Sequence, residues 1–179
     1  MKMKLFLQTL VLLMLGAAVN AQILNPVSWT YSSKKIDAKT YELHLTATIG
    51  DKWHVYSQDA GNGPIPTSFV FDKNPLITTD GKVKEVGTLE KVFDPNFNST
   101  LKYYEHTVDF VQVIKLRSPI KTVVKGTLTY MVCSDKLCLP PKDIPFSIFF
   151  AVNGKNGLMN TAMLAVNCKQ ICKQLSTDF

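Results

Sequence analysis

The sequence lacks most of the features that would assign a chemistry at first sight. Its 179 residues include only four cysteines, too few for a small fold that depends on disulfides instead of a hydrophobic core. No nucleophile, general base and orienting acid form a hydrolase pattern. The segment GNGPIP, residues 61–66, lacks the lysine and the following helix of a phosphate-binding loop. These absences leave a domain with a core of its own and no evident hydrolase or nucleotide chemistry.

Clustered charge is also missing. The formal net charge is +6, but the lysines are scattered and alternate with acidic residues, as in DGKVKEVGTLEK at 80–91. A nucleic-acid-binding face requires basic residues gathered on one side of the fold. We therefore expect a solvated surface and no nucleic-acid partner.

The N-terminus has the pattern of a secretory signal peptide. Lys2 and Lys4 precede an apolar run from Leu5 to Val19, and small residues up to Ala21 suit signal peptidase. This run falls short of the roughly 20 residues that span a membrane, and no later segment approaches that length. We predict a signal peptide at 1–21, export of the protein, and no membrane span after cleavage. Disulfides persist in such an exported environment.

Apolar residues alternate with polar ones through most of the mature chain. In TYELHLTATI, residues 40–49, every second side chain from Tyr41 is apolar, which is typical of a half-buried strand. Six further segments show extended patterns between Gly, Pro, Asn and Asp clusters, at 52–57, 67–72, 82–89, 106–116, 121–132 and 143–152. The pattern predicts an all-β, immunoglobulin-like antiparallel β-sandwich at 22–152.

After residue 152 the periodicity changes. Leu158, Ala162 and Val166 recur at helical spacing, which predicts a short C-terminal helical tail at 153–179. Cys168 and Cys172 fall in this tail, and we assign them no function.

The remaining two cysteines lie in CSDKLCLPP, residues 133–141. Alternation through 121–132 predicts that Cys133 ends a strand on its less buried side, with Cys138 in the connection to the next strand. A disulfide closing so small a ring stabilises a fold by only about 2 kcal/mol, against about 5 for a loop of a hundred residues. Pro140 and Pro141 keep the following segment out of the sheet and stiffen it. On spacing alone, a structural clamp and a redox-active pair both stay open.

Several of these segments together resemble a known family. They are WHVYS at 53–57, GPIPTSFVF at 63–71, FDPNF at 93–97 and, most specifically, YMVCSDKLCLPP at 130–141. Residues 24–152 resemble the N-terminal periplasmic domain of the thiol:disulfide interchange protein DsbD. The resemblance implies an immunoglobulin-like sandwich in the periplasm, without a cofactor, serving as a component of protein-disulfide reduction.

The resemblance also implies roles for individual residues. Cys133 and Cys138 would cycle between dithiol and disulfide, with Cys138 attacking and Cys133 resolving the mixed disulfide. His54 and Tyr56 would line the site, and Phe97 would lie in a loop that caps the disulfide. The chain departs from the family pattern just before the capping aromatic residue, where Pro95 and Asn96 replace the expected acidic residues.

The implied partners are other redox proteins. Electrons would come from a thioredoxin-like domain of a membrane electron-transfer protein. They would pass to a periplasmic disulfide isomerase or to cytochrome c maturation proteins. Because the sequence shows neither a membrane channel nor a second, thioredoxin-like domain, we expect a donor on another polypeptide.

Two other functions compete with this reading. The first is an immunoglobulin-like protein-binding module whose hairpin disulfide is purely structural. The second is a metal-handling domain using Met131, Cys133, Cys138 and His54, which the absence of a dense Met/His cluster disfavours, so that no metal site is expected.

Overall fold

The computed structural model describes residues 24–95, 97–118 and 122–150. The predicted signal peptide and C-terminal helix therefore lie outside the described residues. Within them the chain forms antiparallel strands and no helix, which confirms the predicted immunoglobulin-like β-sandwich. The described part of the chain contains no helix long and apolar enough to cross a membrane.

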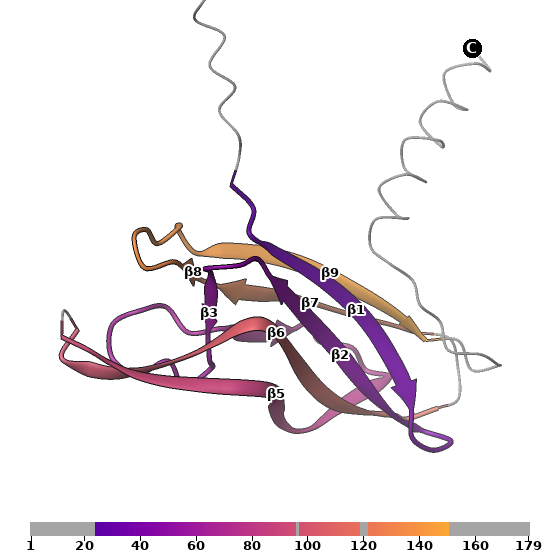
Figure 1. Ribbon diagram of the computed structural model, residues 1–179. Helices are drawn as coiled ribbons and strands as arrows, with labels where there is room; N and C mark the ends of the chain where they lie inside the picture. Colours follow the sequence, from indigo (N-terminus) through magenta and orange to yellow (C-terminus); the bar gives the residue numbers. More distant parts are fainter. Residues whose placement is uncertain (1–23, 96, 119–121, 151–179) are drawn as a thin grey trace, which may run out of the picture.

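The strands form two sheets (Figure 1). The larger sheet has the order β1–β2–β6–β3–β8, and β5 pairs with β6 as its sixth strand. Its strands are β1 (Val27–Lys35), β2 (Thr40–Ile49), β3 (His54–Tyr56), β5 (Ile77–Asp94), β6 (Ser99–Leu116) and β8 (Val132–Cys133). The smaller sheet has the order β4–β7–β9, with β4 (Ser68–Phe71), β7 (Thr122–Tyr130) and β9 (Lys142–Phe150).

The core lies between the inner faces of the two sheets. The alternation seen in the sequence of β2 buries its apolar side chains, and β6, β7 and β9 do the same from their own inner faces. Fully or almost fully buried members include Leu43, Leu45, Phe110, Ile114, Leu128, Tyr130 and Phe146. This core contains residues of both sheets and neither cysteine of the disulfide.

Gly126 of β7 marks the closest approach in the smaller sheet. A β-carbon at this position would lie 2.4 Å from the carbonyl oxygen of Val70 and 2.6 Å from the ring of Phe146. The gap in the apolar alternation at Gly126 therefore has a packing reason, because only a residue without a side chain fits between β4 and the Phe146 ring.

The segment predicted as one strand at 121–132 is two strands in different sheets. β7 ends at Tyr130, and after Met131 the chain enters the larger sheet as β8, where Val132 pairs with Val55 and Cys133 pairs with His54. The predicted location of Cys133 on a less buried side is wrong, because its side chain is only 1% exposed. Strand phase cannot be carried across a point where the chain changes sheets.

The strands predicted at 82–89 and 106–116 are shorter than those in the structure. β5 and β6 each contain 18 residues and pair from Ile77–Leu116 to Asp94–Ser99, with register shifts at two places. Figure 1 shows the two strands side by side up to the turn at the far end of the hairpin. This turn brings the segment around Phe97 next to the cysteine pair.

Candidate functional site

The two cysteines face each other across a tight β-hairpin. Ser134 N–H donates to the carbonyl of Leu137 (2.8 Å), and Leu139 N–H donates to the carbonyl of Val132 (3.0 Å). Between these bonds Cys133 and Cys138 form an antiparallel bridge with their Cα atoms 4.0 Å apart. This is the non-hydrogen-bonded type of pair, in which side chains approach most closely, and a disulfide joins the two sulfur atoms.

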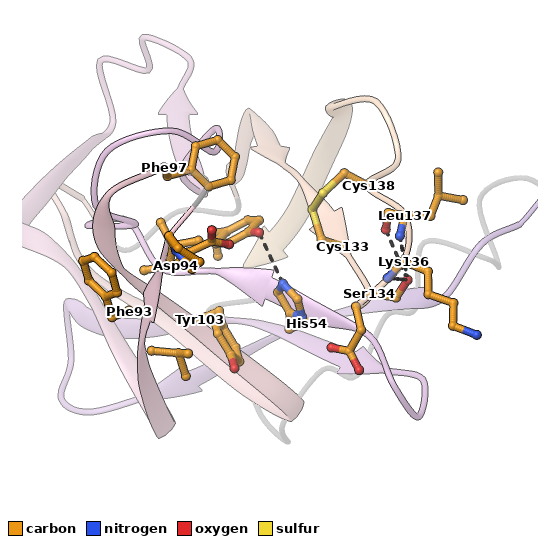
Figure 2. A pocket seen from close by; sticks show the side chains of 15 residues that line it. His54, Phe93, Asp94, Phe97, Tyr103, Cys133, Ser134, Lys136, Leu137 and Cys138 are labelled. Carbon is orange, nitrogen blue, oxygen red and sulfur yellow. Dashed lines mark hydrogen bonds between the residues drawn. A yellow bond between two sulfur atoms is a disulfide. The ribbon is translucent and has the colours of Figure 1, made fainter.

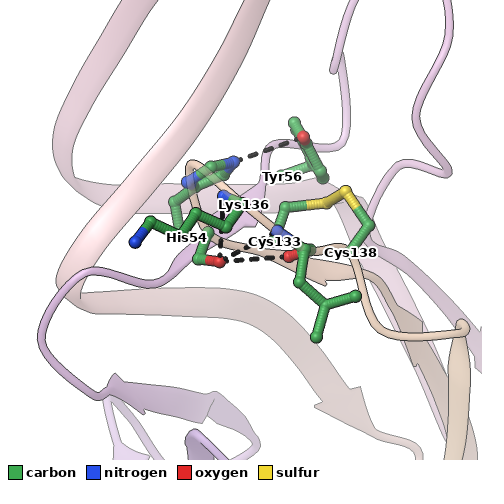
Figure 3. Close-up of a disulfide and its surroundings, with 7 residues drawn as sticks. His54, Tyr56, Cys133, Lys136 and Cys138 are labelled. Atoms are coloured by element: carbon green, nitrogen blue, oxygen red, sulfur yellow. Dashed lines mark hydrogen bonds between the residues drawn. A yellow bond between two sulfur atoms is a disulfide. The ribbon is translucent and has the colours of Figure 1, made fainter.

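The two sulfur-bearing residues differ sharply in exposure. Cys133 packs in a small cluster with Tyr56, Ala60 and Leu101, separate from the main core. Cys138, by contrast, is exposed to solvent. A reagent or protein approaching from outside therefore meets Cys138 first, while Cys133 stays buried. Figure 3 shows the disulfide that joins the two residues.

A pocket of about 380 Å³ opens beside the disulfide (Figure 2). It brings together all five residues that the sequence analysis named as reactive or lining: Cys133, Cys138, His54, Tyr56 and Phe97. The remaining wall comes from the β5–β6 hairpin and the cysteine loop, namely Val92, Phe93, Asp94, Pro95, Leu101, Tyr103, Ser134, Asp135, Lys136 and Leu137.

An aromatic cluster forms the floor of this pocket. The rings of His54 and Tyr103 lie 4.3 Å apart, and Tyr56 meets His54 edge-on at 5.2 Å. The Tyr56 hydroxyl and His54 Nε2 share a hydrogen bond of 3.2 Å. Because His54 pairs directly with Cys133 in the sheet, the cluster is fixed next to the disulfide by backbone register.

The floor is held in its uncharged form. Burial lowers the pKa of His54, an effect that the carboxylates of Glu105 and Asp135 oppose. Burial also raises the pKa of Tyr56, with Asp94 adding to the rise, and that of Tyr103. Near neutral pH the disulfide therefore shares its pocket with neutral aromatic rings, and Asp94 and Asp135 contribute carboxylates to the pocket wall.

Phe97 is positioned by a glycine. A β-carbon at Gly63 would lie 2.1 Å from the Phe97 ring, so the ring packs directly on the Gly63 backbone. Gly63 also has a φ of 129°, a conformation that side chains disfavour. Phe97 itself remains 44% exposed, and Figure 2 shows its ring and the disulfide on different sides of the pocket. The GNGPIP segment thus serves as a packing surface for the aromatic residue.

A half-buried carboxylate connects the end of β3 to β5. Glu85 accepts hydrogen bonds from the Ser57 hydroxyl (2.8 Å), the Gln58 backbone N–H (2.6 Å) and the Tyr104 hydroxyl (2.6 Å). Burial and this hydrogen bond raise the pKa of Tyr104. The network fixes the segment that follows Tyr56 and leads to Gly63.

Pro140 and Pro141 do not line the pocket. Both are exposed and lie between the Cys138 bridge and the start of β9 at Lys142. The sequence analysis did not identify three residues that line the pocket, namely Phe93, Leu101 and Tyr103. The available signal was the pair of aromatic-bearing segments on either side of DPN, residues 94–96, which together indicate a hairpin.

The described residues contain no group of three or more His, Cys, Asp or Glu side chains arranged to hold a metal ion. Met131 packs instead against the cluster around Cys133.

Comparisons with known proteins agree with this arrangement. The fold and the site define the class of this protein: it is a β-sandwich domain with a solvent-accessible disulfide in a hairpin. The family model "Thiol:disulfide interchange protein DsbD, N-terminal" matches residues 20–148, and the chain belongs to this family. No match was found among proteins of curated function.

The similar solved structures include three from Proteus mirabilis and Neisseria meningitidis. The N-terminal periplasmic domain of ScsB from Proteus mirabilis has a TM-score of 0.53 at 14% identity, covering 77% of this chain and 51% of that chain. The reduced DsbD N-terminal domain of Neisseria meningitidis has a TM-score of 0.49 at 19% identity, covering 77% and 94%. The complex of the DsbD and PilB N-terminal domains from the same organism has a TM-score of 0.45 at 16% identity, covering 75% and 94%.

Proposed function

We propose that this domain carries electrons between proteins by thiol–disulfide exchange through Cys133 and Cys138. The observation that carries the proposal is the asymmetry of a hairpin pair in which Cys138 is exposed and Cys133 is 1% exposed. Membership of the DsbD N-terminal family supports it. The pair is easy to open and close, because the core holds the fold and the sheet register keeps both cysteines in place.

The chemistry has two halves. A donor thiolate attacks Cys138 Sγ, the Cys133–Cys138 bond breaks, and Cys133 leaves as a thiolate. The donor's second thiol then displaces Cys138, so the donor becomes a disulfide and this domain a dithiol. In the second half the Cys138 thiolate attacks a target disulfide, and Cys133 resolves the mixed disulfide. Two electrons and two protons pass to the target, which leaves as a dithiol.

The surroundings of Cys138 suit a protein partner. Phe93 is 60% exposed and Leu137 is 52% exposed, and with Phe97 and Val92 they form an apolar rim around the pocket. Exposed apolar residues gathered at one site are typical of a docking surface. We propose that Phe97, which packs on Gly63 across the pocket from the disulfide, can swing over the pair to shield it from small thiols and moves away when a partner docks. We also propose that Pro140 and Pro141 stiffen the exit of the hairpin.

The proposed donor is a thioredoxin-like domain of a membrane electron-transfer protein. The proposed acceptors are a periplasmic disulfide isomerase or cytochrome c maturation proteins. In a solved structure from Neisseria meningitidis a DsbD N-terminal domain forms a complex with a PilB N-terminal domain. We place the present protein in the periplasm, after cleavage behind Ala21. The mass of the protein recovered from the periplasm of a bacterial host tests that cleavage.

The function is tested by trapping the mixed disulfide. Cys133→Ser leaves Cys138 without its resolving partner, so periplasmic partners should accumulate as reducible adducts whose mass spectra map to Cys138. The matched control is Cys138→Ser, which leaves only the buried cysteine and should trap far less. The double variant should trap nothing at this hairpin.

Two results would overturn the proposal. One is the absence of adducts at Cys138 together with a native disulfide that glutathione does not reduce. That outcome supports the competing function, a protein-binding module with a structural disulfide. The other is equal trapping by the two single variants, which would remove the distinct roles of Cys138 and Cys133.

A further inference from the structure

The loop between the cysteines has a hydrogen-bond network of its own. The Ser134 hydroxyl oxygen accepts the backbone N–H groups of Lys136 (3.3 Å) and Leu137 (3.2 Å). The same hydroxyl reaches the Leu137 carbonyl oxygen at 3.3 Å, which the Ser134 N–H also contacts at 2.8 Å. These bonds close a turn that we call the Ser134 turn, residues 134–137 (Figure 2).

None of these bonds involves a sulfur atom. The turn is therefore available to the dithiol as well as to the disulfide, and it fixes Ser134, which follows Cys133, and Leu137, which precedes Cys138. On the other side of the pair, Leu139 N–H bonded to Val132 gives a second point of support. A hairpin held on both sides of the Cys133–Cys138 bridge keeps two thiols opposite each other after reduction.

We infer that Ser134 is a positioning residue for the exchange reaction: its hydroxyl holds the loop closed when the Cys133–Cys138 bond is open. Cys133 then remains in place to attack Cys138 in a mixed disulfide and release the partner's sulfur as a thiolate. This inference rests on the proposed function for its biological use, but it concerns a property of the chain alone. The dithiol behaves as a preorganised pair, and preorganisation favours ring closure over release of a half-reacted cysteine.

The expected direction follows from comparing the two redox states. In the disulfide the covalent bond keeps the loop closed, so Ser134→Ala imposes the full loss of the hydroxyl's hydrogen bonds. In the dithiol the loop can open and recover part of that loss as conformational freedom. The disulfide is therefore destabilised more than the dithiol, and its equilibrium constant against glutathione falls.

The size of the effect is limited by the hydrogen bonds removed. A net contribution of about 1 kcal/mol corresponds to a fall of up to about fivefold in the equilibrium constant. For a two-electron couple this raises the reduction potential by up to about 20 mV. The mixed disulfide of Cys138 with glutathione should also last longer, because Cys133 resolves it more slowly.

The experiment equilibrates the full chain in glutathione buffers of graded composition. Alkylation and mass mapping of the peptide with both residues report this pair alone, so Cys168 and Cys172 do not enter the result. In Ser134→Ala, half of the disulfide should be reduced at a lower proportion of reduced glutathione than in the wild type. Ser134→Thr keeps a hydroxyl and should restore the midpoint.

Thr129→Ala is the matched control. Its hydroxyl donates to Asp143 (2.6 Å) on an exposed part of the β7–β9 pair, outside the cysteine loop, and its loss should leave the midpoint unchanged. An unchanged midpoint in Ser134→Ala, or no restoration by Ser134→Thr, would overturn the inference. Failure to trap protein partners would instead count against the proposed function and leave this measurement intact.

Discussion

The imidazole of His54 lies opposite Cys133 because the two residues are partners in the β3–β8 pair. A histidine beside a cysteine pair is often considered a proton carrier, but burial lowers the pKa of this one. Its neutral ring packs on Tyr103 and shares a hydrogen bond with Tyr56. His54 therefore forms part of the pocket floor and is not assigned a role as a proton carrier.

The lowered pKa of His54 predicts a pH dependence of stability. Because the unfolded chain takes up this proton at a higher pH than the folded protein, stability falls as the pH drops through about 6.5 toward the folded pKa. His54→Phe keeps an aromatic ring and removes the proton site. Urea unfolding at about pH 7.5 and about pH 5.5 should show a smaller loss for His54→Phe than for the wild type. Equal losses would contradict the prediction.

Tyr31 offers a second test at the residue scale. Its buried hydroxyl has no hydrogen-bond partner among the described residues, burial raises its pKa to about 12, and its ring stacks on Phe146 at 6.0 Å. Removing an unsatisfied hydroxyl relieves a desolvation cost, so Tyr31→Phe should be neutral or stabilise by about 1 kcal/mol.

The matched variant for this test is Tyr104→Phe. Its hydroxyl donates to Glu85, so the same chemical change should destabilise the fold by about 1–2 kcal/mol. Urea unfolding of both variants measures the contrast. Similar destabilisation by the two substitutions would show that the Tyr31 hydroxyl has a partner.

At the scale of elements, Glu85 connects β5 to the segment that leaves β3. Its carboxylate accepts three hydrogen bonds, and Glu85→Gln replaces one acceptor oxygen by an amide donor. We expect a loss of about 2 kcal/mol in the free energy of unfolding, measured by urea titration. Glu90→Gln, exposed on the same strand, should change it by less than about 0.5 kcal/mol. Comparable losses in both variants would refute the special role of Glu85.

The elements also show where sequence reasoning succeeds. Strand β2 was predicted to the residue, because one buried face and one polar face alternate without interruption from Thr40 to Ile49. The hairpin strand β5 was predicted only in part, since it lies at a sheet edge and most of its side chains are exposed. Without a buried face a strand has little alternation to detect.

The site was predicted through its motif and not through periodicity. Cys133, Cys138, His54, Tyr56 and Phe97 share one pocket, as the resemblance implied. Three features of that pocket lay beyond the sequence. They are the change of sheets after Tyr130, the pairing that places Tyr103 by His54, and the contact between Gly63 and Phe97, each of which depends on residues far apart in the chain.

For the whole molecule, the separation of core and disulfide predicts a tolerant fold. Reduction should cost only about 2 kcal/mol of stability, the value expected for so small a ring. Urea unfolding with and without a phosphine reductant measures this difference, with the Cys133→Ser/Cys138→Ser variant as a control that the reductant should not affect. A loss of more than about 4 kcal/mol, or loss of the β-sheet circular dichroism signal, would mean that the disulfide is structural.

The closeness of Cys133 and Cys138 in the chain has a consequence for biogenesis. A loop of this length closes on the submicrosecond timescale even in an unfolded chain, long before distant strands such as β1 and β9 find their places. The disulfide can therefore form before the sandwich has folded, and the sandwich can fold before the disulfide has formed. A newly made chain can lose these two electrons to an oxidant either before or after its strands pack into the sandwich.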